Sequence, residues 1–179
     1  AYQAPVIAAG GIQLNTKTGK INQPFAPLTG ASAGLATQGG DQIVITGTNF
    51  GPVRSPQFSP QIMYRPQGNG KLHAATGCQV TVADTEITCL TDVGIGTNLH
   101  FSVVIAGQAS TYQACANAAL CKYAKPEIGD FENSGLPVVD GLGARDATTE
   151  GGQTVRIRGR NFGSAGKSGV EAKYGPCAT

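Results

Sequence analysis

Short runs of apolar and β-branched residues recur along the chain, and turn residues separate them. Examples are QIVITGT at residues 42–48, CQVTVAD at 78–84, TEITCL at 85–90 and LHFSVVIAG at 99–107. Apolar and polar positions alternate in several runs, which is typical of a strand with one buried face. No long stretch shows the 3.6-residue apolar period of a helix. The pattern predicts an all-β chain, with strands near 5–8, 42–48, 61–65, 78–83, 86–90 and 98–106.

One phrase occurs twice in the sequence. Residues 39–51 read GGDQIVITGTNFG and residues 151–163 read GGQTVRIRGRNFG, at a constant offset of 112. Upstream, the spacing Tyr-x-x-Pro-x-Ile occurs at residues 2–7 and again at 123–128, at an offset of 121. Such self-similarity indicates tandem domains. We expect a complete domain at 1–124 and the N-terminal part of a second at 125–179. A short connection over 122–126, restrained by Pro126, is expected to make the array semi-rigid.

The repeated phrase predicts a strand that ends in a tight turn. Ile43 and Ile45 alternate with Val44 and Thr46, so the two isoleucines are expected to face the core. The Gly-x-Asn-Phe-Gly end allows positive φ at its glycines. Its asparagine is expected to bond its own backbone, and its phenylalanine to fold back as a core plug. The second copy predicts the same arrangement.

Composition and charge argue against several classes of function. The chain has 26 glycines and 10 prolines, 13% charged residues and a net charge of +2, without a clustered basic excess. Binding of nucleic acid needs such a cluster, so no nucleic-acid partner is expected. No apolar run approaches the length of a membrane span, and the first residues lack the basic start of a signal peptide. We expect no membrane insertion in this segment, which is expected to be excised from something longer.

The cysteines favour an oxidising compartment, because five occur in 179 residues. Opposite positions in a hairpin have a constant sum. The sum for Cys78 and Cys89, 167, also places Val80 opposite Ile87 and a turn at residues 83–84. This arithmetic predicts a Cys78–Cys89 disulfide, and a pair of free buried thiols is the alternative.

The remaining cysteines follow the same logic. Cys115 and Cys121, in ACANAALC, are expected to close a local loop before the domain exit. Cys177 corresponds to Cys78 in the second domain and is expected to pair with a cysteine beyond Thr179, which makes it unpaired by truncation. No Cys-x-x-Cys occurs, and neither histidine is arranged with the cysteines, so no metal or other cofactor is expected.

Together, GGDQIVITGTNFG, the following Cys78, the ITC at 87–89 and the downstream FSVVIAGQAS resemble the IPT/TIG domain. The resemblance spans the chain and is greatest to the cell-surface branch of that family, in which such domains stand in series with a comparable disulfide. It implies tandem immunoglobulin-like β-sandwiches, the second truncated. It also implies a role in adhesion, receptor stalks or extracellular assembly.

A long insertion at residues 52–73 is the best candidate for specific recognition, because long loops on a rigid sandwich often carry it. Its expected contact residues are Phe58, Ile62, Met63, Tyr64 and Arg65. An ordered loop that merely packs on its own domain is the alternative. The repeated Ser-Pro at Pro56 and Pro60 resembles hydroxyproline glycosylation sites of plant and algal wall proteins, which makes the two prolines candidate glycosylation sites.

Three arginines, Arg156, Arg158 and Arg160, lie two residues apart in the second copy of the phrase. On a strand they would point together and could contact an acidic glycan or protein. Nearby acidic residues could neutralise them, and we favour a solvated face over a binding site. The neutralising candidates are Glu127, Asp130, Glu132 and Glu150.

Two short sequences resemble catalytic motifs, but the flanking residues do not fit either motif. We therefore expect that the protein is not an enzyme. Residues 30–34 fit the Gly-x-Ser-x-Gly pattern of hydrolases, but a strand follows where that motif needs a helix. Residues 166–168 resemble the end of a phosphate-binding loop without its earlier glycine.

Three functional hypotheses remain. The first is an extracellular repeat array that acts through protein–protein contacts, with neighbouring repeats, copies of itself or glycans as partners. The second is an intracellular DNA-binding or dimerisation module of the TIG type, against which the cysteines and the missing basic cluster argue. The third is a carbohydrate-binding accessory domain, which usually needs exposed aromatic platforms, and the chain has no tryptophan.

Overall fold

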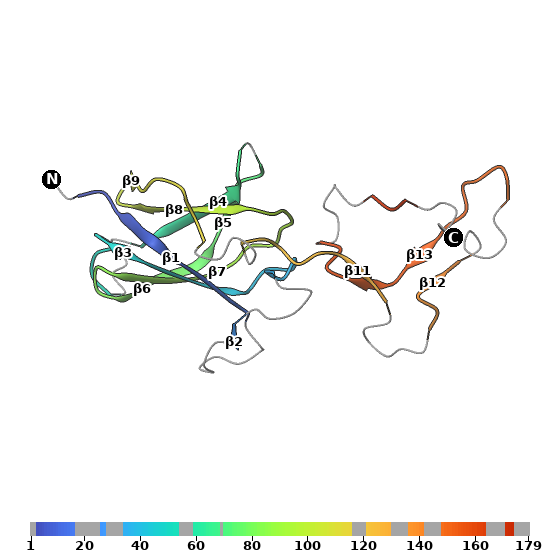
Figure 1. Cartoon of the computed structure of the whole chain (residues 1–179), viewed down its shortest axis with the longest axis horizontal. Coiled ribbons are helices and arrows are strands. Elements are labelled where there is room, and N and C mark those ends of the chain that lie inside the picture. Colours follow the sequence, from blue (N-terminus) through green and yellow to red (C-terminus); the bar gives the residue numbers. More distant parts are fainter. Residues whose placement is uncertain are drawn as a thin grey trace. The chain divides into compact units, whose positions relative to one another are not determined.

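The computed structural model describes residues 3–16, 26–27, 34–53, 59–68, 70–115, 121–129, 136–141, 148–163 and 171–173 (Figure 1). The chain divides into two compact units, unit 1 at Ala1–Ala124 and unit 2 at Lys125–Thr179. The described residues form strands, bridges and turns, and none of them is helical. The predicted all-β class is confirmed.

Unit 1 contains a first antiparallel sheet of five strands. Their order is β2 (Ala26–Pro27), β1 (Val6–Thr16), β3 (Gln42–Thr48), β7 (Glu86–Leu90) and β6 (Thr76–Val82). Ile43 and Ile45 of β3 are fully buried, as their alternation predicted. The central strands therefore bury one face, and β2 and β6 form the edges.

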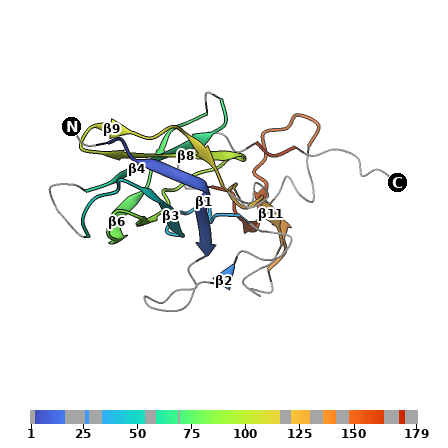
Figure 2. The same ribbon diagram turned by 60° about the vertical axis from the view of Figure 1, so that its left-hand side comes forward.

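A second antiparallel sheet packs on the buried face of the first. Its strands are β10 (Gln113–Ala114), β8 (Leu99–Ile105), β4 (Gln61–Pro66) and β5 (His73–Ala74), and β9 (Gln108–Ala109) also pairs with β8. Figures 1 and 2 both show the sheets as two layers. One hydrophobic cluster joins them, with Ile43 and Ile87 from the first sheet and Tyr64 and Phe101 from the second. This is the architecture of a β-sandwich.

Most predicted strands lie close to the observed ones. Those at 42–48 and 86–90 agree with β3 and β7, whereas β6 begins at Thr76, two residues before its predicted start. The prediction of a strand at 5–8 was too short, because β1 continues to Thr16. The ladder with β3 shifts register between Ile7 and Ile12, and Gly10 within the shift has a φ of 70°. A β-bulge thus lets the strand continue through Gly10 and Gly11, a glycine pair that in the sequence suggests the end of a strand.

Unit 2 contains four short strands, β11 (Glu127–Ile128), β12 (Val139–Asp140), β13 (Arg156–Ile157) and β14 (Gly159–Arg160). β11 pairs with β14, and β12 pairs with β13, both antiparallel. These pairings reproduce those of unit 1. Ile7 lies opposite Gly47 and Ile128 lies opposite Gly159, which preserves both sequence offsets.

The glycine that precedes the Asn-Phe turn in each copy of the phrase, Gly47 or Gly159, lies very close to the neighbouring strand and to the phenylalanine ring. A Cβ on Gly47 would collide with the carbonyl oxygen of Val6 and the ring of Phe50. A Cβ on Gly159 would collide with the carbonyl oxygen of Glu127 and the ring of Phe162. Phe50 is fully buried, which confirms it as a core plug. Glycine is required at this position because a strand backbone and an aromatic ring converge on its α-carbon.

The asparagine of each phrase fixes the strand that starts the unit. Asn49 has a φ of 64° and donates its side-chain N–H to the carbonyl of Ala4 at 3.0 Å. Asn161 has a φ of 62° and donates to the carbonyl of Lys125 at 3.0 Å. The expectation that this asparagine bonds its own backbone was wrong. Its left-handed conformation instead directs the amide across to the starting strand.

The loop before each phrase is also repeated. The amide of Gly39 donates to the carbonyl of Ala36 at 2.9 Å, and that of Gly151 donates to the carbonyl of Thr148 at 3.1 Å. The side chain of Asp41 accepts from the amide of Ala36, and that of Gln153 accepts from the amide of Thr148. The repeated phrase is therefore preceded by the same hydrogen-bonded loop in units 1 and 2.

Candidate interaction surface and domain exit

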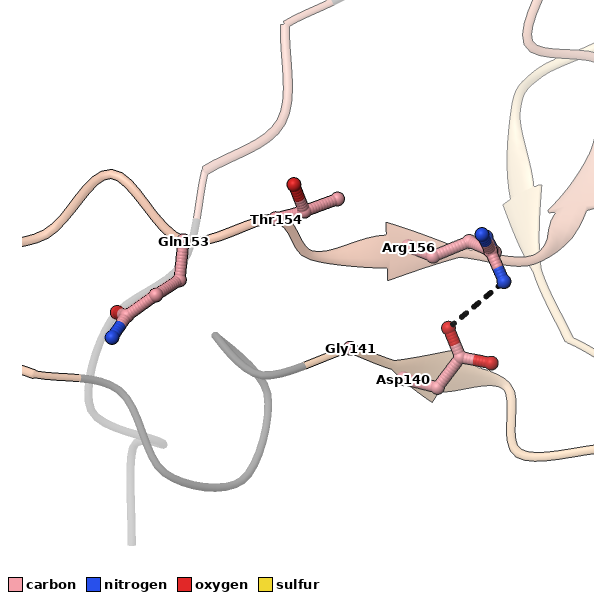
Figure 3. A pocket seen from close by; sticks show the side chains of 5 residues that line it. All are labelled: Asp140, Gly141, Gln153, Thr154 and Arg156. Carbon is pink, nitrogen blue, oxygen red and sulfur yellow. Dashed lines mark ion pairs between the residues drawn. The ribbon is translucent and has the colours of Figure 1, made fainter.

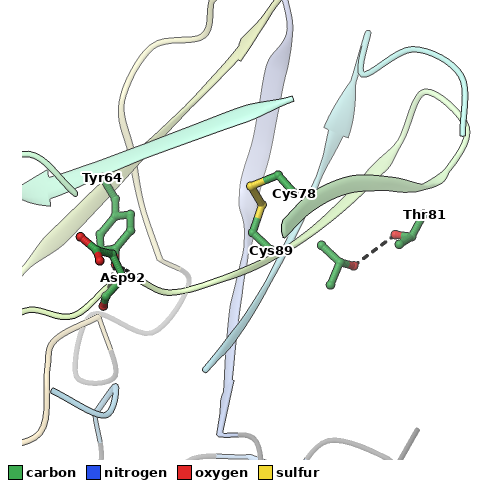
Figure 4. The surroundings of a disulfide bond; sticks show 6 residues. Tyr64, Cys78, Thr81, Cys89 and Asp92 are labelled. Atoms are coloured by element: carbon green, nitrogen blue, oxygen red, sulfur yellow. Dashed lines mark hydrogen bonds between the residues drawn. A yellow bond between two sulfur atoms is a disulfide. The ribbon is translucent and has the colours of Figure 1, made fainter. Parts of the chain in front are cut away.

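Cys78 and Cys89 form a disulfide between β6 and β7, with 4.2 Å between their α-carbons (Figure 4). Val80 lies opposite Ile87, as the hairpin arithmetic predicted. The register shifts on both sides of this pair, and the connection occupies residues 83–85 instead of the expected two. Asp84 in this turn has a φ of 64°.

The second disulfide joins Cys115 and Cys121. Cys121 is fully buried, and its sulfur lies 3.2 Å from the amide nitrogen of Cys115. The bridge lies just before the segment that leads out of unit 1. Cys177, which was predicted to be unpaired by truncation, lies outside the described residues.

The structure corrects part of the predicted contact set in the insertion. Ile62 and Tyr64 belong to β4 and are buried in the core, 1% and 0% exposed, so they are unavailable to a partner. Phe58 and Pro56 lie outside the described residues. Pro60 is buried, which argues against the predicted glycosylation there because a glycan needs an accessible side chain. The hypothesis overlooked that Ile62 and Tyr64 alternate as the inward positions of a strand.

Met63 and Arg65, which alternate with the buried residues of β4, remain as surface positions. Both are half-buried on the outer side of the second sheet. The Arg65 guanidinium lies 4.6 Å from the ring centroid of Tyr112, and Tyr112 is 37% exposed. Arginine and tyrosine are enriched where protein interfaces gain most of their binding energy. We call Met63, Arg65 and Tyr112 the outer patch.

Sequence reasoning missed Tyr112. It lies in the polar run QASTYQA, where no apolar period marks it. A lone aromatic residue within a polar run was the one available signal. Its stacking on Arg65 depends on the pairing of β4 with β8 and of β8 with β10, and these pairings join segments far apart in the sequence.

The opposite side of the second sheet contains a polar cluster of Tyr64, His73, Asp92 and Tyr123, in which the two tyrosines and the histidine are buried and Asp92 is partly exposed. The hydroxyls of Tyr64 and Tyr123 are 2.7 Å apart. The Tyr123 hydroxyl donates to the Asp92 carbonyl at 2.8 Å, and the Asp92 amide donates to the Tyr64 hydroxyl at 2.8 Å. Figure 4 shows Tyr64 directed toward Asp92. The hydroxyl pair thus satisfies backbone groups of the loop after β7.

His73 completes this cluster. Its ring stacks on Tyr64 at 5.2 Å between centroids, and its Nδ1 lies 3.6 Å from a carboxylate oxygen of Asp92 without a hydrogen-bond partner. Burial lowers the pKa of His73 below its usual 6.5, although the carboxylate of Asp92 opposes that shift. Burial raises the pKa of Tyr64 to about 12 and also raises the pKa of Tyr123. All three side chains are therefore neutral near pH 7. The two tyrosines and the Asp92 backbone form a hydrogen-bond network, against which His73 stacks.

Backbone hydrogen bonds also hold the segment that leaves unit 1. The Leu35 amide donates to the Lys122 carbonyl, the Ala124 amide donates to the Leu35 carbonyl, and the Tyr123 amide donates to the Gly96 carbonyl, at 2.8, 2.8 and 2.9 Å. The next residue, Lys125, accepts the Asn161 bond of unit 2.

The arginine row of unit 2 is mostly neutralised. Arg158 and Asp140 form an ion pair at 2.7 Å, and Arg160 and Glu127 form one at 2.6 Å. Arg156 is 69% exposed and lies 3.9 Å from Asp140, beside a pocket whose lining includes Gly141 and Thr154 (Figure 3). Neutralisation by Glu127 was predicted, whereas the role of Asp140 was not.

The described residues suggest no other chemical centre. They contain no group of three histidine, cysteine or acidic side chains placed to hold a metal ion. The described part of the chain also lacks a helix long and apolar enough to cross a bilayer. His73 and His100 lie in strands β5 and β8. The serine of the hydrolase-like motif, Ser32, lies outside the described residues.

Comparison with known proteins adds no relative. No family model matches this chain, and neither a curated protein nor a solved structure matches it significantly. The internal repeat is therefore the comparison on which function must be argued.

Proposed function

We propose that this chain is a noncatalytic segment of an extracellular array of immunoglobulin-like repeats of the IPT/TIG type. It acts in adhesion, a receptor stalk or a surface filament, through contacts with neighbouring repeats, copies of itself or other protein domains. The observation that carries the proposal is the repeated start of each unit. The same glycine approach and the same asparagine bond occur at both sequence offsets.

The ordered end of unit 1 supports a role as a repeat in an array. Backbone hydrogen bonds hold Lys122, Tyr123 and Ala124 within unit 1, and the Cys115–Cys121 disulfide lies just before them. A domain that serves as a spacer needs such an ordered end, because its length contributes to the length of the array.

The two disulfides support an extracellular location. Cytosolic glutathione and thioredoxin keep most protein thiols reduced, whereas secreted domains retain such bridges. Both bridges join residues that are close in the sequence. One links β6 to β7, and the other closes a loop just before the last residues of unit 1. Each bridge adds stability by restricting the unfolded chain.

The outer patch supports contact with protein. Met63, Arg65 and Tyr112 combine an adaptable apolar side chain, a cation and an aromatic ring on a rigid sheet. Arg65→Ala with Tyr112→Ala removes the pair without touching the core. We expect this double variant to weaken association between copies, measured by sedimentation, with little change in stability. Ile95→Ala, at an exposed apolar position outside the patch and outside the insertion at residues 52–73, is the control.

Surface labelling tests the location directly. Antibodies raised against unit 1 are applied to intact and to permeabilised cells of the source organism. The proposal predicts labelling of intact cells or of their secreted matrix. Labelling that appears after permeabilisation alone, in the nucleus or cytosol, would contradict it and would favour an intracellular module.

A further inference from the structure

Unit 1 has two accessible surfaces of opposite charge, and the outer patch is the cationic one. The contact of the Arg65 guanidinium with the Tyr112 ring needs no hydrogen-bond acceptor. The planar N–H groups of Arg65 therefore remain available to a carboxylate. Among the described residues, no carboxylate forms an ion pair with Arg65, whereas Arg158 and Arg160 of unit 2 each have one.

The second surface surrounds the turn between β6 and β7. Asp84 in this turn is exposed, and no side chain in the described part of the chain pairs with its carboxylate. Val53 and Val82 are exposed apolar side chains, at 45% and 50%. We call Val53, Val82 and Asp84 the turn surface. It combines one negative charge with apolar area.

Backbone hydrogen bonds hold the turn surface in one arrangement. The Asp84 amide donates to the Gly51 carbonyl at 2.7 Å, and the Phe50 amide donates to the Asp84 carbonyl at 3.1 Å. Val53 follows Gly51 by two residues, and Val82 precedes Asp84 by two. The bonds thus bring two segments of the chain together around one carboxylate. A surface that is already ordered loses little conformational entropy when it binds.

The residue types of the two surfaces complement each other. Asp84 can accept charge-assisted hydrogen bonds from Arg65, and the exposed valines can pack on Met63 and on the ring of Tyr112. A contact between two outer patches would instead bring two arginines together, which is unfavourable. Charge therefore favours a contact between an outer patch and a turn surface.

The two surfaces lie at different places on unit 1, so they do not neutralise each other within one molecule. Pro66, the residue after Arg65, lies opposite Leu99, and the Leu99 amide bonds to the Cys121 carbonyl near the exit. In Figure 4, Tyr64, which precedes Arg65 on β4, is well separated from Thr81, which leads into the turn. A second molecule can therefore supply the partner of each surface.

We propose that the outer patch binds the turn surface of a second copy of this chain, with the Arg65 guanidinium donating to the Asp84 carboxylate across the contact. The contact is heterologous, because the two surfaces differ. Each pair of molecules retains one free patch and one free turn, so further copies can add. This inference rests on the proposed function and names the partner of its outer patch.

Two single variants test the two sides of the contact in the 1–179 chain with both disulfides of unit 1 intact. Arg65→Glu reverses the charge of the patch. Asp84→Asn removes the carboxylate and retains a residue type that tolerates the φ of 64° at this position. We expect each variant to weaken self-association at least about tenfold in sedimentation experiments. Lys125→Glu, the same charge change at an exposed cation of unit 2, is the control and should have no effect.

A mixture of the two variants tests the pairing itself. Arg65→Glu retains an intact turn, and Asp84→Asn retains an intact patch. The mixture should therefore form one-to-one complexes with an affinity within about threefold of that of the wild type. These complexes should not grow, because their remaining patch and turn are the altered ones. A mixture that sediments as separate monomers would overturn the proposal.

Two further results would overturn the proposal without overturning the proposed function. Asp84→Asn that associates as strongly as the wild type, beside a loss in Arg65→Glu, would show that the outer patch has another partner surface. A wild-type chain that remains monomeric at about 1 mM would show that copies of the chain do not pair. The extracellular location would still be decided by the surface labelling described above.

Discussion

The hydroxyl groups of Tyr64 and Tyr123 lie 2.7 Å apart in the interior of unit 1. Tyr64 comes from the middle of β4, and Tyr123 comes from the segment that leaves the unit. Together they satisfy the backbone of Asp92, which follows β7. One hydrogen-bond network thus links the second sheet, the loop after the first sheet and the domain exit.

Removing either hydroxyl should destabilise unit 1. We expect Tyr64→Phe or Tyr123→Phe to cost about 1–3 kcal/mol, because each leaves buried polar groups unsatisfied. The double variant should cost less than the sum of the two, since the hydroxyls share partners. Urea denaturation measures these values. Tyr112→Phe, whose ring is on the surface, is the control, and an equal loss there would contradict the account.

Stability should fall in mild acid because of His73. Its pKa in the folded unit is lowered from 6.5, so the folded state resists a proton that the unfolded chain accepts. The contribution is complete above about pH 6.5. It declines as the pH falls below that value and levels off below the lowered pKa. Asp92 and Lys71 are the charged groups that act on this imidazole.

The comparison that isolates this effect is His73→Phe, which retains a ring in the stack. The difference in unfolding free energy between wild type and variant should change with pH below 6.5 and be constant above it. Parallel curves for wild type and His73→Phe would show that His73 does not contribute.

The position of Gly47 in the repeated phrase should tolerate no side chain. Gly47→Ala should destabilise unit 1 by about 2 kcal/mol or more, because its Cβ would meet backbone and an aromatic ring. Gly40→Ala is the control, since nothing lies within 4 Å of its Cβ. It should cost about 1 kcal/mol through its positive φ alone.

The same substitution in unit 2 tests whether the phrases are equivalent. Gly159→Ala should break the pairing of Ile128 with Gly159 and speed amide exchange at Gly129, which donates to the Arg158 carbonyl. Gly152→Ala is the control, again with nothing within 4 Å of its Cβ. An unchanged exchange rate in Gly159→Ala would show that the second phrase does not form this turn.

The Cys78–Cys89 bridge should contribute more stability than the shorter one. The chain-entropy relation gives about 3 kcal/mol for its loop and about 2 kcal/mol for that of Cys115 and Cys121. Paired Cys→Ser variants of each bridge, compared by urea denaturation, measure the two values. A loss below 1 kcal/mol for Cys78→Ser with Cys89→Ser would show that the hairpin does not depend on its bridge.

Local pattern predicted much of the fold, and long-range closure explains what it did not predict. Alternation gave β3 and β7 their limits, because the residues that define these strands are adjacent in sequence. The sharing of a hydrogen bond by Tyr64 and Tyr123 depends on sandwich closure across 59 residues. No local period could show it.

Of the errors in the predictions, one has the same cause, because it concerns a contact between strands that are distant in the sequence, and the others concern local patterns. Ile62 and Tyr64 were assigned to a recognition loop because the insertion has no counterpart in the second copy of the repeat. Their own alternation, read alone, indicated a buried strand. Tyr112 was missed because its contact with Arg65 forms across neighbouring strands. The bulge of β1 was missed because a glycine pair is as typical of a loop as of a bulge.

The central claim is that two successive repeats are each clamped across neighbouring strands by their own sulfur bridge. Peptide mapping of the protein from its source, with thiols blocked at lysis and no reductant, measures this most directly. The account predicts one fragment pair joining Cys78 to Cys89, another joining Cys115 to Cys121, and Cys177 bonded to a cysteine from outside residues 1–179. Blocked free thiols at Cys78 and Cys89 would contradict it.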